Sequence, residues 1–443
     1  MLRIIRLSLL FGLLVIASIS IAAGAQAANS RVDVLKVKGV INPVVANYIN
    51  RGITQAEEDD AIACVIQLDT PGGLDTSMRD IVKDIVDSPV PIVVFVSPAG
   101  ARAASAGVFV TMAAHVAAMA PNTAIGAAHP VAIGAEGEAA MSEEMAEKVV
   151  NDAAAYIRSI AEAHGRNLDW AEKAVRESVS ATEQEALELN VIDMVATDLD
   201  SLISQLDGWQ VIMLDGSVIT LNTQGATINQ NPMSAVESFL LAISDPTIAY
   251  ILLSLAILGI TVEIYSPGLI FPGVFGGICL FLSLYSLGVL PINYAGLALI
   301  GLAGGLFIAE VYTASFGIFT TGGIAALVMG SLILFSGRPT LFQPEPWVIP
   351  TVAAVIGSFI AFIVYRVVRT HRRQVKTGKE ELIGKTATVK RALEPKGMVF
   401  YKGELWTAIL DKGQAKLGEE VIITKSDGLT LYVTKPQKII KQK

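Results

Sequence analysis

Short apolar runs alternate with amphipathic stretches over residues 28–207. The runs VDVLKVKGVI, AIACVIQLDT and PIVVFVS predict strands, because each is short, rich in β-branched residues and bounded by turn-forming residues. Between the last two runs, SMRDIVKDIVDS predicts a helix whose apolar face is made of Met78, Ile81, Val82, Ile85 and Val86. Strands that alternate with helices predict an α/β domain with a largely parallel sheet. The edges of such a sheet need covering by neighbours, so we expect a homo-oligomer, a dimer or larger.

The chain then changes character twice. Residues 208–246 contain the polar, turn-rich run LNTQGATINQNP, which predicts a β-rich or irregular connector. Residues 247–368 are almost continuously apolar, and several segments in them approach the ~20 residues that a helix needs to cross a bilayer. These segments are 247–265, 269–290, 293–312, 316–335 and 347–368. We therefore expect an all-α, multi-span membrane domain of about five helices.

Two glutamates occupy matching places in this apolar block. The run EIYSPGLIFPGVFGGI begins at Glu263, and the similar run EVYTASFGIFTTGGI begins at Glu310. A duplicated helical hairpin is the simplest explanation of the similarity. Both glutamates lie near segment ends, so we expect them at the interface or in structural hydrogen bonds. A proton or ion site, and with it a transporter, is the alternative.

Residues 381–436 return to alternating apolar and polar positions. The runs GKTATVKRAL, GMVFYKGELWTAIL and EEVIITKSDGLTLYVTK predict about five short strands that form a small closed all-β barrel of the OB-fold type. Its aromatic residues are not interleaved with arginines as in a base-stacking platform; they are Phe400, Tyr401, Trp406 and Tyr432. We therefore expect a role in protein interaction or assembly, and we do not expect binding to nucleic acid.

The two ends of the chain predict its orientation. Arg3 and Arg6 precede an apolar stretch, and Ala25-Gln26-Ala27 has the small-x-small form of a cleavage site. Residues 1–27 therefore predict a signal peptide, with an uncleaved anchor as the alternative, and the domain that follows is exported. Residues 369–380 form a basic linker, which favours the cytoplasmic side of a membrane. Five crossings place the linker and the barrel there.

Composition and charge agree with this organisation. Hydrophobic residues make up 52% of the chain and charged residues 17%, leaner in charge than an ordinary soluble protein. Residues 371–443 carry 16 Lys and Arg against 8 Asp and Glu, although the whole chain has a net charge of −8. The two cysteines, Cys64 and Cys279, lie in apolar runs, and the four histidines lack ligand spacing. We expect neither a disulfide nor a metal, and the absence of a Walker-type phosphate loop predicts no nucleotide cofactor.

Candidate chemistry lies in two stretches that follow predicted strands. QLDTPGG ends in Gly72 and Gly73, whose backbone amides are suited to holding an anion or an oxyanion. SPAGARAASAG holds Ser97 at the end of a strand and Ser105 at the start of the helix-like run ASAGVFVTMAAHVAAMA. Small neighbours would let a substrate backbone approach Ser105, and a helix N-terminus would favour negative charge.

A nucleophilic serine needs a base, and three residues compete for that role. His115 lies in the same predicted helix as Ser105, where it cannot easily turn back, whereas His129 lies in a loop. Lys148 lies at the edge of the apolar face of the amphipathic helix in SEEMAEKVVNDAAAYIRSIAEAHGRN. A lysine removed from water there would release its proton more readily. An ordinary solvated lysine is the alternative, since Glu143, Glu144 and Glu147 surround it.

The motifs together resemble the long form of the NfeD family, whose members are membrane-bound serine proteases. The resemblance runs through LDTPGG, SPAGARAASAG, MAPNTAIGAAHPV, the Lys148 helix and TEQEALELNVIDMVA. It continues through the membrane block to GKTATVKRALEPKGMVFYKGELWTAI and GEEVIITKSDGLTLYV in the tail. It implies a crotonase-like α/β domain related to the Clp protease and signal peptide peptidase group, followed by the membrane domain and an OB-fold.

The resemblance also implies roles for individual residues. It makes Ser105 the nucleophile and Lys148 the general base, without a Ser-His-Asp triad, and it gives Ser97 and His129 no catalytic role. The oxyanion-hole amides would come from Gly73, with Gly72 as a further candidate, and from Ala106. The acidic residues at 136, 138, 143, 144 and 147 depart from what such a site favours, because nearby carboxylates stabilise a protonated lysine.

The resemblance extends to substrate and setting. It implies a multi-pass protein of a prokaryotic plasma membrane, in contact with lipid, that cleaves apolar polypeptide segments of stomatin- or prohibitin-like membrane proteins. A non-catalytic scaffold that organises such partners in membrane patches is the alternative.

Overall fold

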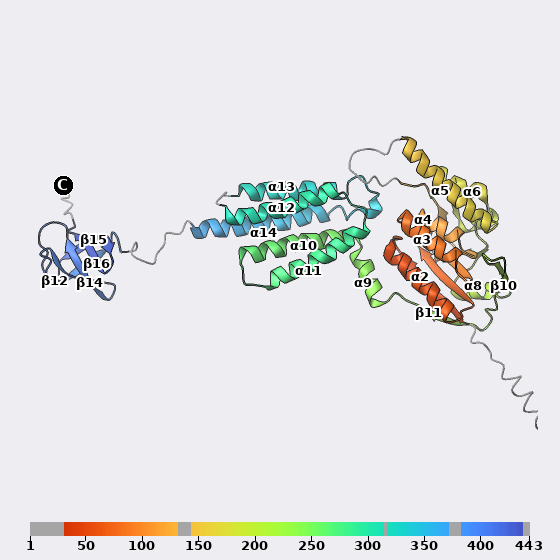
Figure 1. Ribbon diagram of the computed structural model, residues 1–443, viewed down its shortest axis with the longest axis horizontal. Coiled ribbons are helices and arrows are strands. Elements are labelled where there is room, and N and C mark those ends of the chain that lie inside the picture. Colours follow the sequence, from red (N-terminus) through yellow and green to blue (C-terminus); the bar gives the residue numbers. More distant parts are fainter. Residues whose placement is uncertain (1–30, 132–142, 314–316, 372–381, 437–443) are drawn as a thin grey trace, which may run out of the picture. The chain divides into compact units, whose positions relative to one another are not determined.

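The computed structural model describes residues 31–131, 143–313, 317–371 and 382–436 (Figure 1). The predicted signal peptide and most of the basic linker therefore lie outside the described residues. The chain divides into two compact units, residues 1–358 and residues 359–443, and each is described by itself.

The N-terminal part is built on a six-stranded parallel sheet. Its strand order is β11 (Thr227–Gln230), β1 (Arg31–Lys38), β2 (Ala63–Asp69), β3 (Ile92–Val96), β5 (Val116–Met119) and β8 (Met194–Val195). The α/β prediction is confirmed. The boundary predicted at residue 207 is wrong for the sheet, because β11 from the expected connector pairs with β1 through Arg31↔Thr227 to Val34↔Gln230.

Two layers cover the faces of the sheet. Alternate residues of β1 enter different cores: Leu35 and Val37 pack on one face, Val32 and Val34 on the other. The first face is covered by α2 (Pro43–Glu58), α3 (Asp75–Val86), α4 (Ala106–Met112), α5 (Glu143–Ala163) and α6 (Leu168–Arg176). The second is covered by α8 (Leu199–Leu206) and the ribbon of β9 (Gln210–Ile212) and β10 (Val218–Thr220).

A second, smaller sheet lies next to the carboxyl ends of the main strands. It consists of β4 (Arg102–Ala104), β6 (Ala124–Gly126) and β7 (Ser180–Thr182), which leads into α7 (Glu183–Glu188). Thr70, just after β2, bridges to Ala103 of β4. The single helix predicted over ASAGVFVTMAAHVAAMA is wrong: α4 ends at Met112, and β5 begins at Val116. His115 therefore lies between a helix and a strand.

Apolar helices follow in the expected order. A short helix, α9 (Ala235–Ile243), precedes α10 (Pro246–Tyr265), α11 (Phe271–Val289), α12 (Tyr294–Tyr312), α13 (Ile318–Leu334), the 3-10 turn η1 (Thr340–Phe342) and α14 (Val348–His371). The pairs α10–α11 and α12–α13 form the two hairpins that the repeat predicts (Figure 1). Among the described residues, α10 and α11 have the length and apolar composition to cross a membrane, and the apolar parts of the others are shorter.

The matching glutamates serve the hairpin turns. The carboxylate of Glu310 accepts hydrogen bonds from the amides of Gly317 (2.8 Å) and Thr320 (3.0 Å), which lie at the start of α13. In the first hairpin, Glu263 accepts a longer bond of 3.3 Å from the Gly268 amide. Since a helix start leaves its first amides unpaired, Glu310 acts as a cap, the structural role expected for it.

The C-terminal domain is a closed five-stranded barrel, which confirms the prediction of a small all-β domain. Its strands are β12 (Thr386–Arg391), β13 (Lys396–Tyr401), β14 (Glu404–Leu410), β15 (Glu420–Asp427) and β16 (Thr430–Thr434), joined in the order β12-β13-β14-β16-β15. The pairing of β14 with β16 is parallel, and the other strand pairs are antiparallel. Val389, Val399 and Leu431 are fully buried in its core.

Candidate active site

One pocket contains both Ser105 and Lys148. Its volume is about 510 Å³. Its walls come from the turn after β2, from α3, from the start of α4, from the segment after β6 and from α5. The lining residues are Gly73, Asp75, Met78, Arg79, Ser105, Ala106, Phe109, Ala128, Pro130, Val131, Lys148, Val149, Asp152 and Ala153. Four residues of the predicted site, Gly73, Ser105, Ala106 and Lys148, are thus brought to one place from distant parts of the chain.

Ser105 occupies a strained backbone conformation at the start of α4. It is the N-cap residue, with φ 53° and ψ −114°. Such a conformation is costly for a residue with a β-carbon and persists only where its surroundings impose it. Here the Ser105 amide donates to the Gly126 carbonyl (3.1 Å), and the Ser105 carbonyl accepts from the Val108 amide (3.0 Å). The half-buried side chain of Ser105 is therefore held by its backbone at the edge of the pocket.

Gly72 is required by its closeness to Ser105. Its φ is +122°, and a β-carbon at Gly72 would lie 2.8 Å from the Ser105 β-carbon. The Gly72 amide donates to the Thr70 hydroxyl oxygen (3.1 Å), and the same hydroxyl donates to the Gly72 carbonyl (3.1 Å). The Gly72 amide is thus already engaged inside the turn. Thr70 was not singled out from the sequence, although a threonine just before a glycine pair is a common turn signal.

Gly73 and Ala106 present backbone amides that are available to a ligand. Ile41 lies directly against Gly73, where a β-carbon would approach the Ile41 carbonyl oxygen to 2.0 Å. The Ile41 amide donates to Gly72, and the Leu74 amide donates to Ile41, which fixes the turn on both sides. Within the part of the chain that the structure describes, neither the Gly73 amide nor the Ala106 amide donates to another protein group. Both residues line the pocket.

Lys148 forms an ion pair at the rim of the pocket. Its Nζ donates to Glu144 Oε1 at 2.7 Å, and the two side chains are 63% and 78% exposed. The expectation of a lysine removed from water is therefore wrong for this conformation. The acidic departure noted in the sequence is the cause, since Glu144 lies one helical turn before Lys148 and holds the ammonium group toward solvent.

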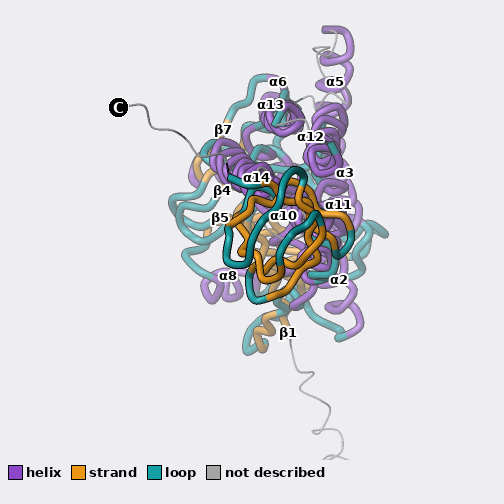
Figure 2. Tube along the Cα trace, turned by 90° about the vertical axis from the view of Figure 1, so that its left-hand side faces the viewer, coloured by secondary structure: helices purple, strands orange, loops and turns teal. Residues whose placement is uncertain are grey.

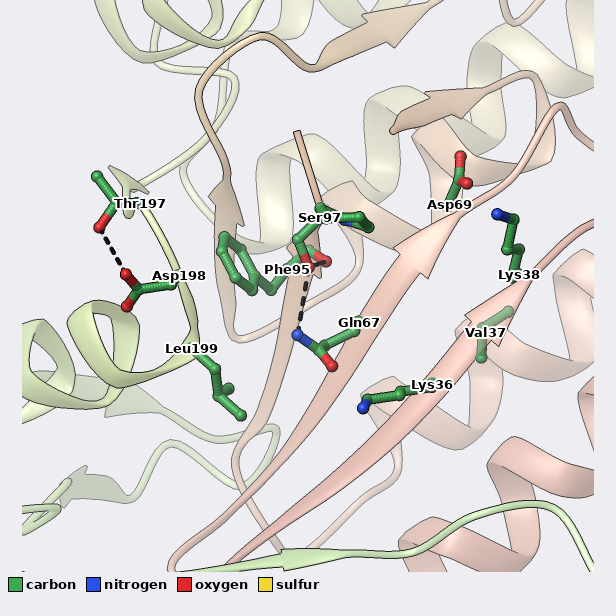
Figure 3. Close-up of a pocket in the computed structure, with 11 residues that line it drawn as sticks. Lys36, Val37, Lys38, Gln67, Asp69, Phe95, Ser97, Thr197, Asp198 and Leu199 are labelled. Atoms are coloured by element: carbon green, nitrogen blue, oxygen red, sulfur yellow. Dashed lines mark hydrogen bonds between the residues drawn. The ribbon is translucent and has the colours of Figure 1, made fainter. Parts of the chain in front are cut away.

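The other candidates lie away from this pocket. His115 Nδ1 accepts from the Ile92 amide (3.1 Å), and burial, aided by the charge of Arg166, lowers the pKa of His115 to about 4. His129 Nδ1 lies 2.8 Å from the Val175 carbonyl. Ser97 lies with Gln67 and Phe95 in a separate pocket of about 400 Å³ (Figure 3). Neither histidine lines the pocket of Ser105.

Three domain descriptions of one family match the chain in order. They are the NfeD1b N-terminal domain over residues 31–206, the NfeD integral membrane domain over residues 247–366, and the NfeD-like C-terminal, partner-binding domain over residues 379–435.

Two curated proteins match along their length. The membrane-bound protease PH1510 of Pyrococcus horikoshii is 37% identical over 419 residues, which are 93% of this chain and 95% of the relative. The membrane protein NfeD1b of Bacillus subtilis is 25% identical over 456 residues, 96% of this chain and 97% of the relative. A solved structure, the 1510-N membrane protease specific for a stomatin homolog from Pyrococcus horikoshii, is 34% identical and covers 49% of this chain and 100% of its own, with a TM-score of 0.43.

Proposed function

The chain belongs to the NfeD family of membrane proteins, and from that premise we propose that it is a membrane-bound serine endopeptidase with a Ser105–Lys148 dyad. The observation that carries the proposal is the shared pocket of Ser105, Lys148 and the unengaged amides of Gly73 and Ala106. The relative at 37% identity, itself named a membrane-bound protease, supports the same reaction class.

The reaction follows from these groups. Ser105 Oγ attacks the scissile carbonyl carbon while Lys148 Nζ accepts the hydroxyl proton. The amides of Gly73 and Ala106 donate to the oxyanion of the tetrahedral intermediate. The C–N bond then breaks as Lys148 returns the proton to the amine leaving group, which leaves an acyl ester on Ser105. A water molecule, deprotonated by Lys148, hydrolyses that ester and restores the serine.

Lys148 must leave Glu144 before it can act as a base. Exposed ion pairs one helical turn apart contribute only about 0.3–0.5 kcal/mol, because water screens both charges. The rearrangement therefore costs little compared with the binding energy of a peptide. We infer that a bound substrate, by excluding water from the pocket, favours the conformation in which the lysine faces Ser105.

The proposed substrate is an apolar segment of a stomatin-like membrane protein. Met78, Phe109 and Val131 give the pocket apolar walls suited to such a segment. The structure described above as a relative is titled as specific for a stomatin homolog. We further propose that the protein is multi-pass and oligomeric in contact with lipid, with the peptidase domain exported and the barrel binding the partner in the cytoplasm.

A non-catalytic scaffold is the second candidate. It is favoured by one observation, the solvent-exposed pairing of Lys148 with Glu144. In that case the site would bind a polypeptide without cleaving it, and the barrel would carry the assembly role.

Hydrolysis by the full-length protein in detergent micelles or nanodiscs distinguishes the two. Fluorogenic peptides with an apolar core are cleaved by the wild type, and Ser105→Ala and Lys148→Ala abolish cleavage. Ser97→Ala and Lys173→Ala are matched controls, since Ser97 lines another pocket and Lys173 lies on α6. Hydrolysis that survives both dyad substitutions rules out the dyad, and a wild type without hydrolysis favours the scaffold.

A further inference from the structure

The part of α5 that carries Lys148 lies outside the core. Residues 144–152 are exposed or half-buried, and full burial begins only at Ala153 and Ala154. The start of the helix extends beyond its neighbours (Figure 2). Core packing therefore fixes the second half of α5 but does not determine where the helix places Lys148.

Arg79 is the polar tether nearest to Lys148. Its guanidinium reaches from α3 to α5, where Nη2 donates to Asp152 Oδ2 (2.5 Å), and its Cζ lies 4.5 Å from the centre of the Tyr156 ring. Nε of the same side chain donates to Asp75 Oδ2 (2.9 Å). The Arg79 side chain is 35% exposed, so water screens these contacts only in part. Asp152 lies one helical turn after Lys148, at the point where α5 enters the core.

This tether joins the two halves of the proposed site. α3 begins at Asp75, two residues after Gly73, and the stacking of Phe109 on Tyr156 (6.0 Å between centroids) links α4 to α5 near the same point. Arg79 therefore connects the helix that follows the oxyanion turn with the helix that carries the base.

The charges around Lys148 give Arg79 a second effect. Glu144 and Asp152 stand one turn before and one turn after Lys148 on α5, both within reach of its ammonium group. Glu144 pairs with Lys148, whereas Asp152 pairs with Arg79. Among the remaining neighbours, Glu147 is exposed on α5 and Asp75 is bound by Arg79. On α6, the charges of Glu172 and Arg176 pair with each other.

We propose that Arg79 is a positioning residue of the peptidase site. It fixes the start of α5 against α3 and engages the Asp152 carboxylate, which would otherwise become a second partner of Lys148. The inference rests on the proposed function, because it assigns Arg79 an effect on the base.

The test compares pH–rate profiles of the full-length protein. Arg79→Gln lowers kcat by about tenfold, since a displaced base is costly, and it moves the acidic limb of the profile to higher pH, because a freed Asp152 stabilises the protonated lysine. Arg79→Gln/Asp152→Asn returns the limb to its wild-type position, while Arg79→Lys retains part of the rate. Arg158→Gln, which breaks another ion pair between α5 and α6, leaves the profile unchanged.

Other outcomes overturn the inference. A rate loss in Arg79→Gln with an unmoved limb, or a limb that Asp152→Asn does not restore, assigns Arg79 to stability alone. A raised KM with unchanged kcat makes Arg79 a substrate contact.

A readout independent of hydrolysis separates this inference from the proposed function. In a Ser105→Ala background, lysines are ¹³C-methylated and the Lys148 resonance, assigned with Lys148→Arg, is titrated by NMR. Arg79→Gln moves the titration midpoint upward if the inference holds, even where the wild type shows no hydrolysis. An unmoved midpoint refutes it, whatever the activity.

Discussion

Lys148 donates a 2.7 Å hydrogen bond to Glu144, one helical turn earlier, on the rim of the pocket that Ser105 also lines. The proposed base is thus held in a conformation that it must leave in order to work. The pair is exposed, so the holding energy is small, and it consists of a local electrostatic preference that a single substitution removes.

Replacing Glu144 with glutamine extends hydrolysis to lower pH. Loss of about 0.3–0.5 kcal/mol of ion pairing moves the acidic limb of the pH–rate profile down by roughly 0.2–0.4 pH units. The profile of kcat against pH measures the shift, and Glu162→Gln, at the exposed far end of α5, is the control. A limb that stays in place or moves upward contradicts the role given to Glu144.

Replacing Gly72 with alanine inactivates the enzyme beyond its effect on stability. The new β-carbon would lie 2.8 Å from that of Ser105, so the serine or the turn must move. Gly39→Ala is the matched control, because Gly39 also has a positive φ, +108°, but open space around its β-carbon position. Both variants lose about 1–3 kcal/mol of stability from backbone strain.

Single-turnover acylation and thermal unfolding separate the two effects. Gly39→Ala retains acylation at temperatures where it is folded, and Gly72→Ala does not. Equal acylation by the two folded variants would show that the approach of Gly72 to Ser105 has no functional importance.

Acid destabilises the α/β domain through a buried histidine pair. His115 and His164 lie with ring centroids 6.0 Å apart, and burial, with the charge of Arg166 nearby, lowers their pKa values to about 4 and about 3. The unfolded chain binds these protons near the ordinary histidine value of about 6.5. The histidines' contribution to stability is therefore complete above pH 6.5 and is lost as the pH falls toward 4 and then 3.

Thermal unfolding between pH 7 and pH 3.5 measures this dependence. The midpoint falls across that range in the wild type, and it falls less steeply in His115→Gln/His164→Gln. Asp198→Asn, which alters an exposed helix cap elsewhere, serves as the control. An unchanged slope in the double variant assigns the acid sensitivity to other groups.

Glu310 contributes more to the helical hairpins than Glu263. Glu310→Ala removes a two-amide cap from α13 and lowers stability by about 1–2 kcal/mol, whereas Glu263→Ala removes one long hydrogen bond. Thermal unfolding of both variants in the same detergent provides the comparison. A larger loss in Glu263→Ala would indicate that the first hairpin depends on its glutamate for another reason.

Local periodicity was enough to predict most elements. Amphipathic α3, the apolar helices from α10 to α14 and the alternating strands of the barrel each bury a face, and burial leaves a regular pattern in the residues themselves. Ser105 could be singled out in the same way, from a strand followed by small residues and a helix start. The choice of Lys148 depended on family resemblance, because periodicity does not distinguish a base from a solvated lysine.

Periodicity failed where long-range pairing or a change of direction decided the outcome. Strand β11 is short and largely exposed, so it carries no apolar pattern, and only its ladder with β1 makes it a strand. The run through His115 is uniformly apolar, and the same composition suits the end of α4 and the start of β5. The pattern of burial alone cannot show where the chain turns.

The site shows the same division between sequence and tertiary structure. The residue types at Ser105, Gly73, Ala106 and Lys148 were evident along the chain, because small residues and glycine turns have local signatures. The engagement of the Gly72 amide by Thr70, the pairing of Lys148 with Glu144 and the tether from Arg79 to Asp152 were not. Each depends on which groups lie within hydrogen-bonding distance after folding, and for the tether those groups come from helices far apart in the chain.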